Sequence, residues 1–434
     1  MARVRAFRAH TFARTVADID DLTAPPYDVI SPEEREALLS KSPHNIVALE
    51  LPEGSLDPAV PGNRYETGAA RWKAWQAEEI LVRDAVPTLY VLEQRFTLGE
   101  REVRRRAFIV ELKLEPFDAG VVLPHERTLP KALGDRLNLT RACAANLSQV
   151  LGLYPDSERA ADVLFEAVMA TEPAMSAVDV DGANSTVWST TDPATIDALS
   201  VALADKQVFI ADGHHRYTTA LAYRDERRAA DAAAGRTPTD PAYDWVMMAL
   251  VNMDDPNLVV LPTHRVANAP GDFDNDAFYQ ALSGLFDICD LPPGHPAGAL
   301  DSLVRPGFLV QARDEARPRL AELRPDVDLD TVIPLPRSRA WKELDVAVLL
   351  ELVLEPILGI HPDKPETLER LTFVKDVHQA LKMTADHDVA FVLRATPMDQ
   401  LREVALAGDM MPQKSTYFYP KLLSGLVMRG MAED

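Results

Sequence analysis

The 434-residue sequence predicts a mixed α/β (α+β) protein, and three patterns support that fold class. An apolar run at 208–210 stops at Asp212-Gly213 and is followed by an Ala-, Leu-, Tyr- and Arg-rich segment, which is typical of a buried strand, a glycine turn and a helix start. Segments 88–96 and 103–115 flank a short glycine-containing turn and predict a hairpin. Beyond residue 270, segments of helical and strand character are mixed, which predicts a separate C-terminal α/β region.

The first predicted element is a stiff loop at 24–30, which reads APPYDVI. Its two prolines hold the backbone extended, so the loop presents Tyr27 and Asp28 from a rigid support. Ser31 then suits a helix N-cap and Pro32 the first helical position. The loop is equally compatible with a binding site and with a rigid connection that only precedes the next helix.

The next elements follow from periodicity and composition. Weak alternation at 45–51 predicts a strand, and tryptophans near helical spacing at 65–81 predict a helix. The basic run at 101–106 lies on the second hairpin strand and is interpreted as a solvated sheet edge. Strands are expected at 245–251 and 258–261.

The C-terminal region is expected to form its own domain. Helices are predicted near 276–285, 344–353, 373–384 and 398–406, with a strand at 389–393. The predicted domains are therefore 1–268, which contains the central strand-turn-helix, and 269–434, which ends in the motif PQKSTYFYPK.

Charge and cysteine content exclude several classes of protein. The net charge is −22, from 45 basic and 67 acidic residues, and such a surface repels nucleic acid and anionic lipid. Cys143 and Cys289 lie far apart without a CxxC pattern, which argues against structural zinc and a disulfide framework. No apolar run is long enough to span a bilayer and the N-terminus lacks a signal-peptide pattern, so a cytoplasmic protein is expected.

The strand-turn-helix at 206–221 holds the strongest candidate site. A helix N-terminus offers unpaired N–H groups and a partial positive charge, and His214, His215 and Arg216 add cationic donors there. This corner suits phosphate. A metal site made of the two histidines is the weaker alternative, because adjacent helical residues do not face each other.

Two further segments carry chemistry. The loop around His125 and Glu126 supplies an acid/base pair, with Arg136 on the following helix, although a polar turn is the ordinary alternative. Near the C-terminus, Gly408 to Lys414-Ser415 copies the spacing of a phosphate loop. Gln413 replaces its second glycine, Pro412 removes an amide and a helical segment precedes it, so a P-loop fold is excluded.

The C-terminal segment still has the groups to bind a nucleotide. Lys414, Ser415 and Thr416 offer an ammonium and two hydroxyls beside three aromatic residues that could stack on a base. A hydrophobic tail packed on the core is the alternative.

The segment IADGHHRYTTAL resembles the signature of a bacterial and archaeal family of unknown function, often labelled ParB/SpoOJ-like. Its DGHHR core is similar to the phosphate-binding motif of the ParB/sulfiredoxin superfamily, which includes nucleotide-dependent kinases of free serine. The resemblance implies a ParB/sulfiredoxin-like core with N-terminal elaborations. The corresponding motif of sulfiredoxin reads GCHR, whereas this chain has GHHR, so the reactive thiol of sulfiredoxin is missing here.

The resemblance implies a kinase that phosphorylates a small hydroxyl metabolite, with free L-serine to O-phosphoserine the first candidate. ATP or ADP, with CTP as an alternative, and Mg²⁺ are the expected cofactors, and a homodimer is one expected assembly. The alternative is a ParB-like regulator that binds or hydrolyses nucleotide without an acceptor. The expected roles are catalysis by Glu126, Asp212 and His215; nucleotide binding by Gly213, His214, His215, Arg216, Lys414, Ser415 and Thr416; substrate binding by Tyr27, Asp28, His125 and Arg136; and metal binding by Asp212.

Overall fold

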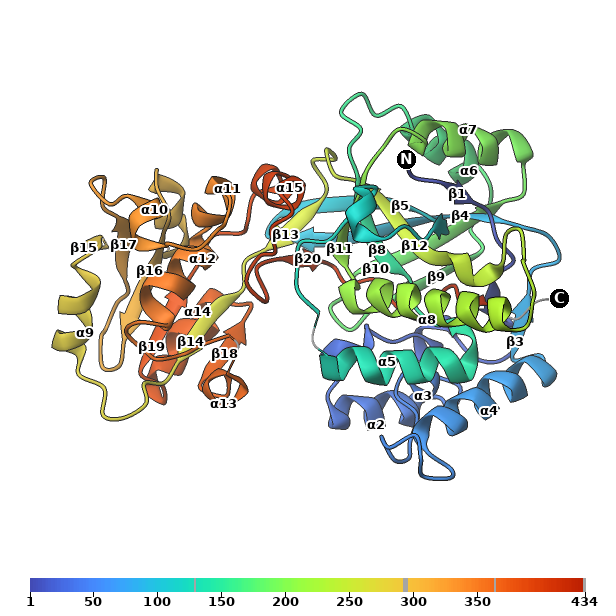
Figure 1. Cartoon of the computed structure of the whole chain (residues 1–434), viewed down its shortest axis with the longest axis horizontal. Coiled ribbons are helices and arrows are strands. Elements are labelled where there is room, and N and C mark those ends of the chain that lie inside the picture. Colours follow the sequence, from blue (N-terminus) through green and yellow to red (C-terminus); the bar gives the residue numbers. More distant parts are fainter. Residues whose placement is uncertain (129, 292–295, 363, 432–434) are drawn as a thin grey trace. The chain divides into compact units, whose positions relative to one another are not determined.

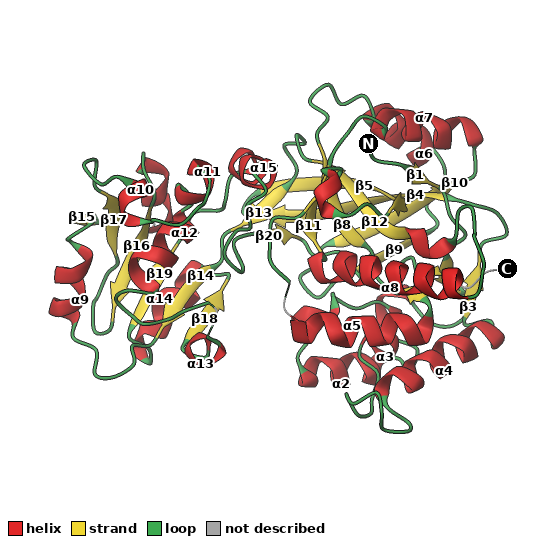
Figure 2. Cartoon of the chain, in the orientation of Figure 1, coloured by secondary structure: helices red, strands yellow, loops and turns green. Residues whose placement is uncertain are grey.

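The computed structural model describes residues 1–128, 130–291, 296–362 and 364–431, and the chain forms two compact units (Figures 1 and 2). Unit 1 comprises Met1–Pro124, Thr128–Val259 and Pro420–Asp434. Unit 2 comprises His125–Arg127 and Val260–Tyr419. The predicted folding domains 1–268 and 269–434 stay a prediction.

Unit 1 is built on a mixed sheet of nine strands among the described residues. Its order is β6 (Val122–Leu123), β11 (Val208–Asp212), β8 (Val150–Tyr154), β12 (Trp245–Asn252), β5 (Arg101–Lys113), β4 (Leu89–Leu98), β10 (Asn184–Thr190) and β9 (Met175–Val178), with β1 (Val4–Arg5) also on β5. β11 runs parallel to β6 and antiparallel to β8. The mixture of parallel and antiparallel pairs with helices confirms the predicted fold class.

Helices cover this sheet. α5 (Pro130–Cys143) packs against α8 (His214–Ala233) and against α4 (Arg64–Ala77), as Figure 1 shows. α6 (Asp162–Met169) packs on the sheet and against α7 (Pro193–Leu203). The shorter elements of unit 1 are β2 (His10–Phe12) paired with β3 (Leu81–Arg83), β7 (Ala145–Asn146) paired with β21 (Arg429–Gly430), α1 (Ile19–Leu22), α2 (Pro32–Lys41), α3 (Val47–Glu50) and a 3-10 turn at Tyr27–Val29.

Three local predictions are confirmed in unit 1. Ser31 caps α2 in a full capping box, because its side chain accepts from the Glu34 N–H while the Glu34 carboxylate accepts from the Ser31 N–H. β4 and β5 form the expected hairpin. The segment after Gly213 is the 20-residue helix α8.

The predicted strand at 45–51 is wrong, because this segment forms the short helix α3. The Asn45 side chain accepts from the Val47 N–H at 2.9 Å and donates to the carbonyls of Asp21 and Thr23, which fixes the start of the turn. Residues 46–49 are all buried. A segment buried on every side gives no reliable periodicity, so the alternation carried no information.

The interpretation of the basic run at 101–106 as a solvated edge is only partly correct. β5 pairs with β12 only over residues 108–113, and among the described residues the run itself pairs with β4 alone. Arg104 is exposed, but Arg105 is buried and donates to the Gln94 side chain and to the carbonyl of Pro420. These acceptors let a guanidinium lie inside the sheet layer.

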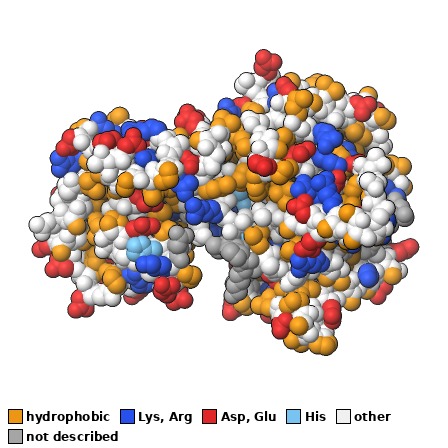
Figure 3. Space-filling model, in the orientation of Figure 1, with side chains coloured by type: hydrophobic (Ala, Val, Ile, Leu, Met, Phe, Trp, Pro, Cys, Tyr) orange, Lys and Arg blue, Asp and Glu red, His pale blue; other side chains and the backbone are white. Residues whose placement is uncertain are grey.

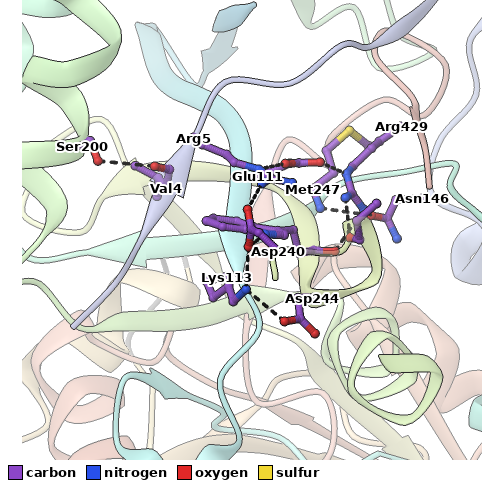
Figure 4. A network of polar contacts seen from close by, with 12 residues as sticks. Val4, Arg5, Glu111, Lys113, Asn146, Ser200, Asp240, Asp244, Met247 and Arg429 are labelled. Atoms are coloured by element: carbon purple, nitrogen blue, oxygen red, sulfur yellow. Dashed lines mark hydrogen bonds and ion pairs between the residues drawn. The ribbon is translucent and has the colours of Figure 1, made fainter. Parts of the chain in front are cut away.

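The C-terminal segment is tied into unit 1 by a buried ionic network, shown in Figure 4. Arg429 pairs with the buried carboxylate of Glu111 and donates to the carbonyls of Ala242 and Trp245 at 2.7 and 3.0 Å. Arg5 contacts the same carboxylate from the N-terminal side. Residues from both ends of the sequence therefore meet on β5.

Unit 2 contains a six-stranded antiparallel sheet among the described residues. Its order is β15 (Phe286–Asp290), β17 (Arg319–Leu323), β16 (Gly307–Ala312), β19 (Val389–Val392), β14 (His264–Ala267) and β18 (Leu371–Val374). Its remaining elements are α9 (Asn275–Leu282), α10 (Leu329–Val332), α11 (Arg339–Lys342), α12 (Asp345–Leu349) with a π-helical continuation at Leu350–Leu354, α13 (Pro365–Leu368), α14 (Val377–Lys382) and α15 (Met398–Leu406); β13 (Val259–Leu261) pairs with β20 (Tyr417–Tyr419).

One helix predicted in unit 2 is only partly correct. The predicted helix at 373–384 begins too early, since β18 continues to Val374 and α14 begins at Val377. Asp376 sets this boundary, because its side chain accepts from the Gln379 N–H at 2.7 Å as an N-cap. Within the residues described here, no helix is both long and apolar enough to cross a membrane.

Candidate functional site

The turn between β11 and α8 requires a glycine. Gly213 has φ of +92° and is the N-cap of α8 without a side-chain cap. A Cβ at this position would lie 2.9 Å from Nε of Arg216, so the missing side chain leaves room for that guanidinium. The turn therefore places the N-terminus of a long helix, without a side-chain cap from Gly213, beside Arg216.

Asp212, the last residue of β11, is held by two cations. Its carboxylate pairs with Lys421 Nζ at 2.7 Å and with Arg216 Nη2 at 3.6 Å. Burial alone would raise the pKa of Asp212, but the charges of Lys421 and Arg216 hold it well below its usual range. Asp212 is therefore ionised and committed to these partners.

Asp212 also interacts electrostatically with a third cation, Arg105. Burial lowers the pKa of Arg105 to about 10, and the charge of Asp212 opposes that change. The positive charges of Arg105, Arg216 and Lys421 thus all act on one carboxylate, and each of the three side chains is mostly buried. Charges in such surroundings act strongly on an anion, because water screens them little.

A small cavity of about 40 Å³, lined by both polar and apolar side chains, opens beside Arg216 in unit 1. At roughly 10–15 Å³ for each water position, it has room for about three waters or for the polar end of a ligand. Three residues singled out in the sequence, Tyr27, Arg136 and Arg216, line it together. Its other polar lining residues are Glu50, Thr140, Asn146, Ser148 and Thr219.

Arg136 is a fixed wall of this cavity. Its guanidinium lies 4.1 Å from the centroid of the Tyr27 ring and donates to Glu50 Oε2 at 3.2 Å. It also forms two hydrogen bonds with the carboxylate of Asp135. Burial raises the pKa of Tyr27 to about 12, so its phenol stays protonated at neutral pH.

Buried polar atoms in and beside the cavity lack partners. Thr219 Oγ1, Glu50 Oε1 and Gln149 Oε1 make no hydrogen bond with any described residue, although these residues are only 3%, 4% and 1% exposed. The backbone carbonyl of Gln149 accepts from Arg216, which itself lines the cavity. Unsatisfied buried oxygens are costly, so ordered water or the polar groups of a ligand would satisfy them.

The second group of predicted residues comes together in unit 2. Met411 N–H donates to the His125 carbonyl at 2.8 Å, which joins the two segments. His125 Nε2 lies 3.0 Å from Thr416 Oγ1, and Lys414 N–H donates to Glu126 Oε1 at 3.4 Å. Two motifs almost 300 residues apart therefore form one cluster.

Arg265 stabilises the loop around Lys414 through hydrogen bonds to its backbone. This guanidinium is buried and donates to the carbonyls of Gln413 and Lys414 at 3.3 and 3.0 Å. Burial lowers the pKa of Arg265 to about 9. The Ser415 hydroxyl donates to the Pro412 carbonyl within the turn, whereas the Lys414 side chain is exposed.

The remaining predicted residues are placed as follows. His214 is buried and His215 half-buried in the first turn of α8, while Asp28 is exposed on the 3-10 turn after the prolines. The described residues contain no group of three His, Cys, Asp or Glu side chains arranged to hold a metal.

Sequence reasoning missed Glu50, Arg105, Thr219 and Lys421. Of these four residues, only Glu50 stands out in the sequence, because it is a carboxylate inside the apolar segment VALEL. The other three became significant through contacts with distant segments. Lys421, for example, reaches a carboxylate 209 residues earlier in the chain.

Comparisons with known proteins give low overall similarities to solved structures. A conserved hypothetical protein from Pyrococcus furiosus is 11% identical, with 72% of this chain and 92% of that chain covered and a TM-score of 0.34. Free serine kinase in complex with AMP is 12% identical over 71% of this chain and 86% of that chain, with a TM-score of 0.34. A variant of free serine kinase in complex with ADP is 11% identical over 71% and 87%, with a TM-score of 0.35.

Likeness at these TM-scores assigns no role to any residue of this chain. No curated protein matches the sequence. A family model matches residues 4–347, which is most of the chain, and that family is described as a protein of unknown function. The chain therefore belongs to the DUF1015 family.

Proposed function

We propose that this protein is a nucleotide-dependent kinase of a small hydroxyl metabolite, with free L-serine to O-phosphoserine as the first reaction to test. The supporting observation is the mostly buried group of Arg105, Arg216 and Lys421 around Asp212 at the start of α8. Three cations at the N-terminus of a long helix suit the phosphates of a nucleotide. The choice of serine comes from the resemblance of the DGHHR motif to serine kinases.

The transfer would form a bond between the acceptor hydroxyl oxygen and the terminal phosphorus. The bond from that phosphorus to the bridging oxygen would break, and its electron pair would stay on the departing nucleotide. The hydroxyl proton must pass to a nearby carboxylate. The residues at the start of α8 would bind the phosphates, with Arg216 stabilising the charge that develops on the transferred group.

We assign the proton acceptor to Glu50. One of its oxygens accepts from Arg136, and the other has no hydrogen-bond partner among the described residues. The hydroxyl of the acceptor would lie in the cavity beside Thr219 and Tyr27, within reach of that free oxygen. Glu126 and Asp28 were the carboxylates that the sequence favoured for this step, and they remain the alternatives.

Asp212 suits a positioning role better than the predicted metal role. Both of its oxygens already pair with cations, so they are poor ligands for Mg²⁺. Nucleotides commonly bring Mg²⁺ with only one or two protein carboxylates, and the assay therefore includes it. Lys414, Ser415 and Thr416 are retained as predicted nucleotide contacts, with His125 as a predicted substrate contact.

The proposal is tested with the full chain, ATP or ADP, Mg²⁺ and a panel of small hydroxyl metabolites led by L-serine. Phosphorus NMR should show a new phosphomonoester signal that depends on both nucleotide and acceptor. Glu50→Gln should reduce turnover by about 10²-fold or more with nucleotide binding retained, since it removes the proton acceptor while the amide oxygen can still accept from Arg136. Arg216→Met should weaken nucleotide binding itself.

Arg227→Met is the matched control, since Arg227 is an exposed arginine on the same helix α8. It should leave both nucleotide binding and turnover unchanged. If Glu126→Gln abolished turnover while Glu50→Gln did not, the assignment of the base would be wrong. Nucleotide hydrolysis with no phosphorylated acceptor across the panel would overturn the kinase proposal and support the ParB-like regulator.

A further inference from the structure

Unit 2 has a second and much larger cavity that the proposed kinase reaction does not use. It encloses about 500 Å³, which is in the range of small-molecule binding sites. Its walls come from the loop before β16, the end of β17 and the segments around α11 and α15. Every residue that lines it belongs to unit 2.

The lining of this cavity is rich in arginine, although the protein as a whole is strongly acidic. Two carboxylates, Glu343 and Asp345, also line it. The arginines are Arg305, Arg324, Arg339 and Arg394, so cations outnumber carboxylates by two. Acidic and basic side chains are mixed over the face of the molecule that Figure 3 shows.

Arg394 is fixed in place before any ligand binds. It makes two 2.8 Å hydrogen bonds to the carboxylate of Asp345 and donates to the carbonyls of Leu303 and Arg305, both at 3.1 Å. Asp345 also accepts from the Gly307 N–H at 2.9 Å. The negative charge of Asp345 is therefore already engaged, and Arg394 forms a rigid wall.

The other three arginines are available to a ligand. Arg324 pairs with Asp326, and Arg339 pairs with Glu343 one helical turn away, but both arginines are at least one-third exposed. Exposed pairs of this kind contribute little to stability and rearrange easily. The Arg305 guanidinium is exposed and makes no ion pair or hydrogen bond with the residues that the structure describes.

We propose that this cavity binds a small organic dianion, either a phosphate monoester or a dicarboxylate. Arginine presents planar pairs of N–H donors that match the oxygens of either group. Apart from Gln400, the rest of the lining is proline and aliphatic and suits a short carbon skeleton; it comprises Val304, Pro306, Leu323, Pro325, Val327, Leu329 and Pro397. The proposal is independent of the kinase reaction, which is placed in unit 1.

The test is titration calorimetry of the full chain at low salt, with glycerol 3-phosphate, succinate and uncharged glycerol as probes. At least one dianion should bind at one site per chain, and glycerol should not bind. The stronger of the two dianions identifies the class of ligand. Raising the salt concentration should weaken the binding, because charge–charge attraction supplies much of it.

Arg305→Glu and Arg324→Glu should each weaken binding about tenfold or more, because each replaces an attractive charge by a repulsive one. Arg317→Glu is the control, since Arg317 is an exposed arginine of unit 2 outside the cavity. It should bind as the unchanged protein does. Binding that persists in Arg305→Glu but disappears in Arg216→Met would belong to unit 1 and overturn the proposal, as would no binding of either dianion.

Discussion

Asp212 is the carboxylate that holds the cations of the candidate site together. Its pairs with Lys421 and Arg216 keep it ionised in the folded protein at pH values where an ordinary aspartic acid would be protonated. Replacing it leaves buried positive charge without a partner. The cost of breaking a buried pair in this way is about 3–5 kcal/mol.

The Asp212→Asn variant should therefore be less stable than the unchanged protein across the neutral range. Because the folded pKa of Asp212 is depressed, its contribution is fully present above the unfolded value of about 3.9 and is lost as the pH falls below that value. Thermal melts should show a constant difference between pH 5 and 8 and a shrinking one below about pH 4. A difference that widened on acidification would contradict the assigned pairing.

Gly213 gives a second prediction for a single residue. Gly213→Ala should destabilise the protein by about 1–2 kcal/mol and weaken nucleotide binding, because the new Cβ meets the Arg216 side chain and φ is positive. Gly134→Ala is the matched control, since Gly134 lies within α5 with open space around it. It should raise stability by about 0.5–1 kcal/mol without changing binding.

At the scale of elements, the short strand β21 is anchored by the ion pair between Arg429 and Glu111. Arg429→Met should cost about 3–5 kcal/mol, because it leaves the Glu111 carboxylate buried with a weaker set of partners. Arg5→Met removes a half-exposed partner of the same carboxylate and should cost clearly less. Chemical denaturation of both variants measures the difference, and equal costs would show that the burial of Arg429 is not decisive.

Local patterns predicted elements well where the signal lies within a few residues. The capping box of α2, the hairpin of β4 and β5 and the glycine turn before α8 all depend on neighbouring residues. The failure at 45–51 and the burial of Arg105 have the opposite cause. Contacts with distant segments turned the first into a buried helix and buried the guanidinium of the second against Gln94 and the carbonyl of Pro420.

The candidate site was predicted in part for the same reason. Tyr27, Arg136 and Arg216 were each singled out from local chemistry, and the structure gathers them around one cavity. Nothing in the sequence around Arg105 or Lys421 shows that either lies near Asp212. Such pairings are set by the three-dimensional fold, which a single sequence does not display.

At the scale of the whole molecule, the net charge of −22 predicts that the protein does not bind anionic polymers. Duplex DNA is strongly anionic, so the protein should show no binding to it at physiological salt. Fluorescence anisotropy with a labelled duplex checks this expectation, and a salt-sensitive complex would contradict it. The absence of binding would argue against a role in which DNA is the partner.

The return of the chain into unit 1 after residue 420 has a consequence for biosynthesis. A ribosome must translate 209 further residues after Asp212 before it adds Lys421, and Arg429 comes later still. A nascent chain that has emerged only as far as the DGHHR motif lacks the partner lysine, so Asp212 forms this ion pair only after the later segment has been synthesised.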